Sequence, residues 1–276
     1  MDDDVFISRH RRLALIFEDT EKQYTTNKKL RKATEEARQK AKLYGAKEEL
    51  DFQRDKRQNY VKVEVTNERT FEAAKRLLSE GAGKVAVLNF ANSVRPGGGV
   101  VGGSGAQEES LCRCSNLYPT LDQDEFHEKY YHANAARRDG LGSDAIIYSP
   151  DVTVFKSDTD YPEMLPEDEW YQVDVITCAA PDFHFMRKEL DYMEQHDLHL
   201  RRAKRILEVA LENGVRNLVL GAFGCGAFRN DPWAVARAYS DALKRYGHNF
   251  ERVVFAIYYR EYETKNYETF KKIFYE

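Results

Sequence analysis

The chain has 276 residues, 42% hydrophobic and 32% charged, which allows one sizeable α/β domain with an appendage but not two full enzymes. Its 42 basic and 46 acidic residues give a net charge of -4, which excludes general nucleic-acid binding, so any phosphate binding must be local. No apolar stretch is long enough for a membrane span, and the acidic N-terminus MDDDVFISRHRR lacks the features of a signal peptide. We therefore expect a cytosolic (cytoplasmic) protein with no membrane partner.

The four cysteines are Cys112, Cys114, Cys178 and Cys225, and their spacing is neither that of a structural zinc site nor that of a disulfide scaffold. Cys112 and Cys114 could supply half of a metal site, but no second Cys/His pair at ligand spacing accompanies them. We predict reduced thiols, packing of these two side chains in a helix, and no metal.

Residues 1–58 are rich in Lys, Arg, Glu and Gln, lack Pro, and carry Leu13, Ile16 and Phe17 at intervals near helical spacing. We predict a helical extension over residues 1–58 and a catalytic core over residues 59–276. Residues 27–47 are so polar that the pattern fits either a solvated helix or a loop, and we assign them no chemistry.

From residue 60 the pattern changes to strands alternating with helices, which favours a mostly parallel or mixed sheet with helices on both faces. In such sheets ligands bind at the carboxyl ends of the strands. The predicted strands are Tyr60–Val65, Lys84–Phe90, Ala145–Phe155, Tyr171–Ala180, Asn217–Leu220 and Arg252–Tyr259, and the predicted helices are Thr70–Glu80, Ser110–Leu117, Met193–Glu212 and one starting near Pro232.

A first glycine-rich loop follows the strand that ends at Phe90, and it runs from Asn92 to Glu109. Its glycines expose backbone N–H groups and permit positive φ, the local geometry with which a chain wraps phosphate or ribose. A floppy surface loop is the simpler alternative. However, a disordered linker would not be expected to end in two adjacent carboxylates and a helical run.

A second glycine-rich loop, Gly221 to Asp231, follows the strand that ends at Leu220. Asp231 is a natural N-cap and Pro232 suits the first helical position, so the loop lies where backbone amides and the helix dipole favour an anion such as diphosphate. The sequence matches neither a Walker loop nor the dinucleotide fingerprint. Phosphate binding without a phosphoryl-transfer lysine indicates ligand binding or glycosidic chemistry.

Glu108 and Glu109 end the first loop, and glycoside cleavage needs an acid for the leaving oxygen and a carboxylate to activate water. Neighbouring side chains point in different directions, so one would face the scissile bond and the other would hold a ribose hydroxyl. Ligand packing and mutual repulsion would raise the pKa of at least one carboxyl. On position alone, solvated acids at a helix start remain an equal alternative.

These motifs resemble a known family. The run Gly97, Gly98, Gly99, then seven residues, then Gln107, Glu108 and Glu109 is similar to the signature of poly(ADP-ribose) glycohydrolases, and its flanking residues resemble the microbial branch. The run Gly224, Cys225, Gly226, Ala227 and Phe228 resembles the family's diphosphate-binding loop. The resemblance covers roughly Tyr60 to Tyr259.

The resemblance implies a macrodomain-like mixed sheet, flanked by helices, that binds ADP-ribose or poly(ADP-ribose) without a cofactor. Glu109 would protonate the leaving ribose hydroxyl and then activate water, with Glu108 and Gln107 orienting the scissile ribose and the catalytic residue. Asn92 would contact the distal ribose, and Phe228 would pack against it. The family's adenine pocket uses residues near the ends of the outer strands, where Tyr258, Tyr259 and Ala180–Asp182 lie, and Tyr259 is the contact suggested among them.

Three alternatives remain open from the sequence. A macrodomain could bind ADP-ribose without hydrolysing it, although the intact Gln107-Glu108-Glu109 run argues against this. A hydrolase of the same fold could act on mono-ADP-ribosylated protein or nucleic acid, because these substrates share the ADP-ribose half. The third and weakest alternative is an interaction protein that works through its N-terminal helices.

Overall fold

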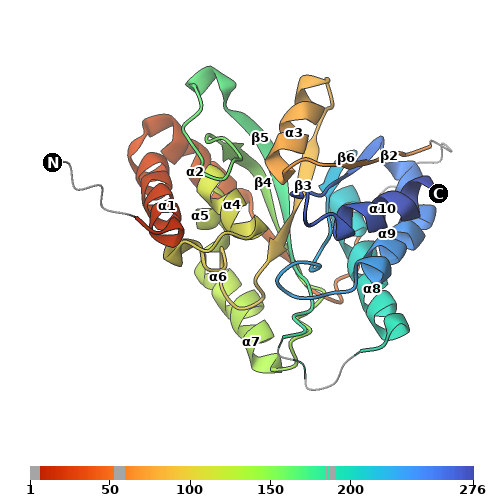
Figure 1. The fold of residues 1–276 in the computed structure, drawn as a ribbon. Helices are drawn as coiled ribbons and strands as arrows, with labels where there is room; N and C mark the ends of the chain where they lie inside the picture. The colour runs from red at the N-terminus through yellow and green to blue at the C-terminus, as the bar shows by residue number, and fades with distance from the viewer. Residues whose placement is uncertain (1–6, 53–59, 185, 187–189) are drawn as a thin grey trace.

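The computed structural model describes residues 7–52, 60–184, 186 and 190–276 (Figure 1). The domain boundary predicted between residues 58 and 59 lies outside these residues. The helices are α1 (Arg9–Thr26), α2 (Lys28–Lys40), α3 (Thr70–Ser79), α4 (Gln107–Cys114), α5 (Leu117–Leu121), α6 (Asp124–Phe126), α7 (Ala133–Arg137), α8 (Tyr192–Glu212), α9 (Pro232–Tyr246) and α10 (Lys265–Tyr275). The strands are β1 (Lys42–Tyr44), β2 (Lys62–Thr66), β3 (Val85–Ala91), β4 (Ile146–Val154), β5 (Tyr171–Ala179), β6 (Asn217–Leu220) and β7 (Arg252–Ala256).

The strands form one seven-stranded sheet in the order β1-β4-β5-β3-β6-β7-β2. The five strands from β5 to β2 run parallel, whereas β4 and β1 are antiparallel additions at one edge. Helices α1, α2 and α4 lie on one side of the sheet and α8, α9 and α10 on the other (Figure 1), and each side has its own apolar cluster. The predicted mixed sheet flanked by helices is therefore confirmed.

Local sequence signals account for several element ends. Helix α3 ends at Ser79 and is followed by Gly81 with φ of 83°, the left-handed conformation that favours glycine after a helix. Helix α9 begins at Pro232, and Asp231 accepts a hydrogen bond from the Trp233 N–H at 2.7 Å, as an N-cap should. Among the described residues, no helix combines the length and apolarity needed to cross a bilayer.

The N-terminal segment differs from the predicted helical extension. Helices α1 and α2 form, but the chain then adds Lys42–Tyr44 (β1) to the sheet edge, where Leu43 lies opposite Ile147 of β4. Three residues are too few for an alternating pattern to be recognised, and the partner strand decides their conformation. Strand β7 is also shorter than predicted, because it ends at Ala256 and not at Tyr259.

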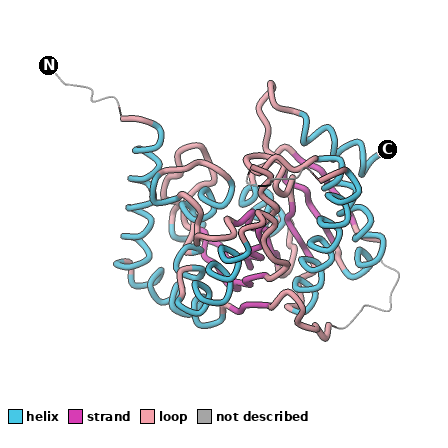
Figure 2. The backbone as a smooth tube through the Cα atoms, turned by 90° about the horizontal axis from the view of Figure 1, so that it is seen from below, coloured by secondary structure: helices cyan, strands magenta, loops and turns pink. Residues whose placement is uncertain are grey.

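The order of the strands places both glycine-rich loops side by side. Strands β3 and β6 are parallel neighbours, with Val85 opposite Asn217, and the two loops leave them at Ala91 and Leu220. Figure 2, a view from below, shows loop segments gathered between the helices on the two sides of the sheet. The site therefore forms at the carboxyl ends of adjacent central strands, where ligands of open α/β sheets bind.

Candidate active site

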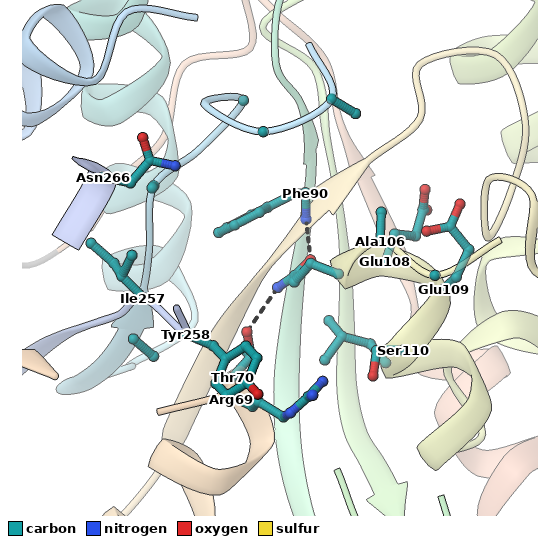
Figure 3. Close-up of a pocket in the computed structure, with 18 of the residues that line it drawn as sticks. Arg69, Thr70, Phe90, Ala106, Glu108, Glu109, Ser110, Ile257, Tyr258 and Asn266 are labelled. Carbon is teal, nitrogen blue, oxygen red and sulfur yellow. Dashed lines mark hydrogen bonds between the residues drawn. The ribbon is translucent and has the colours of Figure 1, made fainter. Parts of the chain in front are cut away.

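The two glycine-rich loops border a cavity of about 520 Å³, a size that suits a nucleotide-like ligand. Figure 3 shows Glu108 and Glu109 at one end, and Ile257, Tyr258 and Asn266 at the other. Of the residues predicted from the sequence, the cavity wall contains Asn92, Gln107, Glu108, Glu109, Gly224, Gly226, Ala227 and Phe228. The structure therefore brings residues of both predicted loops together around one cavity.

Gln107 fixes the start of α4, so both glutamates lie in its first turn. Its Oε1 accepts a hydrogen bond from the Phe90 N–H at 2.8 Å, and its Nε2 donates to Thr70 Oγ1 at 3.0 Å (dashed lines in Figure 3). The same Nε2 also donates to Leu88 O at 2.8 Å. These tertiary contacts replace a side-chain cap, which is why α4 starts before the predicted Ser110. With its amide engaged within the protein, Gln107 is suited to positioning the glutamates.

Glu108 is buried and held through both carboxyl oxygens. Its Oε2 accepts from the Asn92 N–H at 2.7 Å and its Oε1 from Asn89 Nδ2 at 3.3 Å. Burial raises the pKa of Glu108 to about 8, against the opposing effect of the Asn92 hydrogen bond, and the charge of Glu109 adds to the rise. This carboxyl therefore titrates close to neutrality.

Glu109 has one carboxyl oxygen fixed and the other without a partner. Its Oε1 accepts from the Gly99 N–H at 2.9 Å, whereas the buried Oε2 accepts no hydrogen bond from the described residues. Gly98 has φ of 58°, and a Cβ built on it would lie 2.5 Å from Glu109 Oε1. Gly97, Gly98 and Gly99 do not line the cavity. Gly98 and Gly99 instead form the backbone against which Glu109 packs, and Gly97 packs beside Tyr118.

The side chain of Asn230 holds the second loop in place through hydrogen bonds. This buried side chain donates through Nδ2 to Pro181 O at 2.8 Å and to Gly224 O at 2.9 Å, and its Oδ1 lies 2.7 Å from His199 Nε2. Because Asn230 Oδ1 can only accept, the proton of His199 is assigned to Nε2. Burial lowers the pKa of His199 to about 4, so the ring is neutral near pH 7.

The second loop presents backbone donors at the cavity wall. Within the described part of the chain, the N–H groups of Gly226, Ala227 and Phe228 have no hydrogen-bond acceptor. A Cβ built on Gly226 would meet no atom within 4 Å, so its surroundings are open. Cys225 does not line the cavity, and its N–H donates to Ala222 O at 3.1 Å. The loop therefore has the free amides that a diphosphate needs.

Of the two tyrosines that follow β7, Tyr258 lines the cavity and Tyr259 does not. Tyr259 lies outside the cavity lining, and its ring packs on Tyr267 with 4.7 Å between centroids. Tyr258 lines the cavity, with the Arg69 guanidinium 4.2 Å from its ring centroid. The sequence prediction for Tyr259 assumed a strand continuing to that residue, whereas β7 ends at Ala256.

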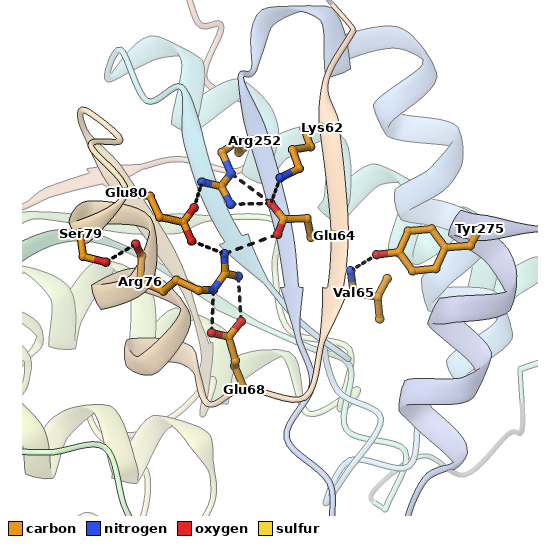
Figure 4. Close-up of polar contacts among 9 residues, drawn as sticks. All are labelled: Lys62, Glu64, Val65, Glu68, Arg76, Ser79, Glu80, Arg252 and Tyr275. Atoms are coloured by element: carbon orange, nitrogen blue, oxygen red, sulfur yellow. Dashed lines mark hydrogen bonds and ion pairs between the residues drawn. The ribbon is translucent and has the colours of Figure 1, made fainter.

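Several polar residues of the site were not predicted, among them Asn89, Asp158 and Glu68. Asn89 is buried in β3, and its only sequence signal was a lone amide in the apolar run KVAVLNF. Asp158 accepts from the Phe71 N–H at 3.0 Å, and burial raises its pKa. Glu68 lines the cavity, and Arg76 holds it through two hydrogen bonds of 2.8 Å (Figure 4).

A mixed sheet with two adjacent glycine-rich loops at its carboxyl edge, around a cavity that ends in paired carboxylates, defines a macrodomain-like ligand-binding domain. A family profile described as microbial-type PARG, catalytic domain, matches residues 16–157. The chain belongs to this family.

Solved structures with this fold cover nearly the whole chain. Poly(ADP-ribose) glycohydrolase (PARG) from Thermomonospora curvata is 31% identical with a TM-score of 0.84, and the alignment covers 95% of this chain and 99% of that one. A second structure of that enzyme, bound to the inhibitor ADP-HPD, is 30% identical over the same shares with a TM-score of 0.81. PARG from Deinococcus radiodurans in complex with ADP-ribose is 35% identical over 87% of this chain and 96% of that one, with a TM-score of 0.75. No curated protein sequence matches the chain.

Proposed function

We propose that the protein is a poly(ADP-ribose) glycohydrolase that cleaves ribose–ribose O-glycosidic bonds and releases ADP-ribose. The observation that carries the proposal is the pair Glu108 and Glu109 at one end of a nucleotide-sized cavity whose wall includes the free amides of the second loop. Two similar structures support the same substrate class. The poly(ADP-ribose) glycohydrolase from Thermomonospora curvata is bound to ADP-HPD, and that from Deinococcus radiodurans is bound to ADP-ribose.

Glu109 is the acid and base of the proposed reaction. Its partnerless Oε2 gives a proton to the leaving ribose hydroxyl oxygen as the glycosidic C–O bond breaks. The resulting carboxylate then takes a proton from the water that attacks the oxocarbenium-like carbon, which restores the acid. The Gly99 N–H holds Oε1 throughout and keeps the carboxyl in place.

The other predicted residues bind the ligand around this centre. Glu108 holds a hydroxyl of the scissile ribose, and Asn92 and Phe228 contact the distal ribose. The free amides of the second loop, including that of Gly226, bind the diphosphate. Adenine lies toward Tyr258, at the end of the cavity away from the glutamates. A cytoplasmic location stays a prediction from the sequence.

Product analysis tests the proposal directly. Purified protein is incubated with poly(ADP-ribose), mono-ADP-ribosylated protein and ADP-ribosylated DNA, and the released products are separated and quantified. We expect ADP-ribose from the polymer. Binding of ADP-ribose without any released product would identify a non-catalytic macrodomain, and release from a mono-ADP-ribosylated substrate alone would identify a hydrolase of that type.

A further inference from the structure

Arg9, in the first turn of α1, lies at the cavity rim beside Gly105, and Arg12 follows three residues later on the same helix face. A Cβ built on Gly105 would lie 2.9 Å from Arg9 Nη1, and Gly105 lines the cavity together with Glu109. One turn later, the Arg12 guanidinium lies 3.9 Å from the ring centroid of the partly exposed Tyr161. Because residues three apart share a helix face, Arg9 and Arg12 form one cationic surface beside the carboxylates.

The helix that carries these arginines is fixed to the core. A Cβ on Gly103 would collide with the backbone oxygen of His10, so the first loop packs directly on the first turn of α1. Further along α1, Thr20 Oγ1 donates to Arg113 O at 2.7 Å, and Lys156 Nζ donates to Ile16 O at 3.0 Å. Arg9 and Arg12 are thus presented by a docked helix.

Neither ion pairing nor the helix dipole accounts for these two cations. Both side chains are exposed, and within the described ranges neither Arg9 nor Arg12 forms an ion pair, whereas Arg11 pairs with Glu18 at 3.1 Å. Cations in the first turn of a helix oppose its dipole, so they do not stabilise α1. In a chain with a net charge of -4, their placement on one face of α1 is a local feature.

The chemistry of the substrate explains what such a surface would bind. In a ribose–ribose linkage of poly(ADP-ribose), the leaving hydroxyl belongs to the adenosine ribose of the next unit, so an adenine and a 5′-diphosphate follow within a few bonds. We propose that Arg9, Arg12 and Tyr161 form a subsite for this leaving ADP-ribose unit. The guanidinium groups pair with its diphosphate, and the aromatic ring offers a stacking face for its adenine. This inference rests on the proposed glycohydrolase function.

The test compares polymer with monomer. The double variant Arg9→Gln/Arg12→Gln is titrated with poly(ADP-ribose) of two or more units and with monomeric ADP-ribose, in a Glu109→Gln background that slows turnover. Polymer affinity should fall about tenfold and ADP-ribose affinity should stay within about twofold, since monomer occupies the cavity alone. With Glu109 intact, kcat/KM for polymer should fall by a similar factor. Arg11→Gln removes the same charge from the same turn and should change neither affinity.

Three results would overturn the subsite. These are unchanged polymer affinity in the double variant, an equal loss in Arg11→Gln, or a parallel loss of affinity for ADP-ribose. The first excludes a role for the two arginines, the second reduces the effect to overall charge, and the third places the effect in the cavity or the fold. Failure of the unmodified protein to hydrolyse polymer would instead reject the proposed glycohydrolase function, and this result is distinct from the three above.

Discussion

Glu108 and Glu109 are neighbours in one helical turn but lie in different surroundings. The sequence predicted that the pair would divide its work, because successive side chains on a helix point about 100° apart. It could not predict which carboxyl is held by the protein, because that depends on Asn89 and Asn92, which lie 16 to 19 residues earlier in the chain. The structure leaves a partnerless oxygen on Glu109, the residue expected to be catalytic.

Glu109→Gln keeps the size of the side chain and its hydrogen bond with Gly99 but removes the titrating proton. Turnover of poly(ADP-ribose) should therefore fall at least about 10²-fold, whereas ADP-ribose binding should survive. Glu108→Gln serves as the matched variant and should change affinity and rate together, because its role is to hold the ribose. Steady-state kinetics and a binding titration on both variants measure this. A dead Glu108→Gln beside an active Glu109→Gln would reverse the two roles.

The raised pKa of Glu108 predicts a pH-dependent stability. The unfolded carboxyl titrates at 4.5 and the folded one at about 8, so the folded protein retains a proton that the unfolded chain releases. This stabilising contribution is fully present below pH 4.5 and is lost as the pH rises through 8. Thermal unfolding between pH 5 and 8.5 should therefore show a steeper fall in Tm for the unmodified protein than for Glu108→Gln. Parallel curves would show that Glu108 titrates normally in the fold.

At the scale of elements, the sequence predicted those helix starts and loops that are determined by residues close together in the chain. Asp231 and Pro232 marked the start of α9, and the glycine content marked both loops. Elements that depend on distant partners were missed or misplaced, such as β1, which follows the edge of β4, and the start of α4, which follows Gln107 and not a capping side chain. The contact between His199 and Asn230 spans 31 residues and left no local signal.

Gly226→Val tests the second loop as a diphosphate site. A branched side chain beside the free amides should obstruct phosphate and weaken ADP-ribose binding by well over tenfold, which is roughly 1.4 kcal/mol per decade. The fold should survive, because a Cβ at Gly226 meets no protein atom within 4 Å. Gly83→Val is the control, since Gly83 is equally open but does not line the cavity. Calorimetric titration of ADP-ribose into both variants measures the affinities. Unchanged ADP-ribose affinity in Gly226→Val would show that the second loop is not part of the site.

At the scale of the whole molecule, the cavity joins distant parts of the chain. Its wall includes Glu68 before α3, Glu109 in α4, Phe228 after β6 and Asn266 in α10. A ligand that contacts all of these segments binds the folded state and not the unfolded chain. Occupancy of the cavity should therefore couple to the stability of the entire sheet and not only to that of one loop.

ADP-ribose should accordingly raise the Tm of the protein. With affinity in the micromolar range, a concentration 100 times Kd stabilises the folded state by about 2.7 kcal/mol. AMP and ribose phosphate fill only part of the cavity and should give smaller shifts. A thermal-shift titration measures the three ligands side by side, and no response to saturating ADP-ribose, with AMP and ribose phosphate equally inert, would contradict the cavity assignment.

The strand order also decides how early the sheet can begin to form while the chain is being synthesised. Of the described strands, the first three pair only with strands made later: β1 with β4, β2 with β7, and β3 with β5 and β6. A chain leaving the ribosome therefore cannot begin the sheet until Ile146 has emerged, and β2 finds its neighbour only when Arg252 arrives. The apolar β3 has no strand beside it until β5, which begins at Tyr171, has emerged. Such late, long-range pairing makes folding slow and leaves the nascent chain dependent on protection from aggregation.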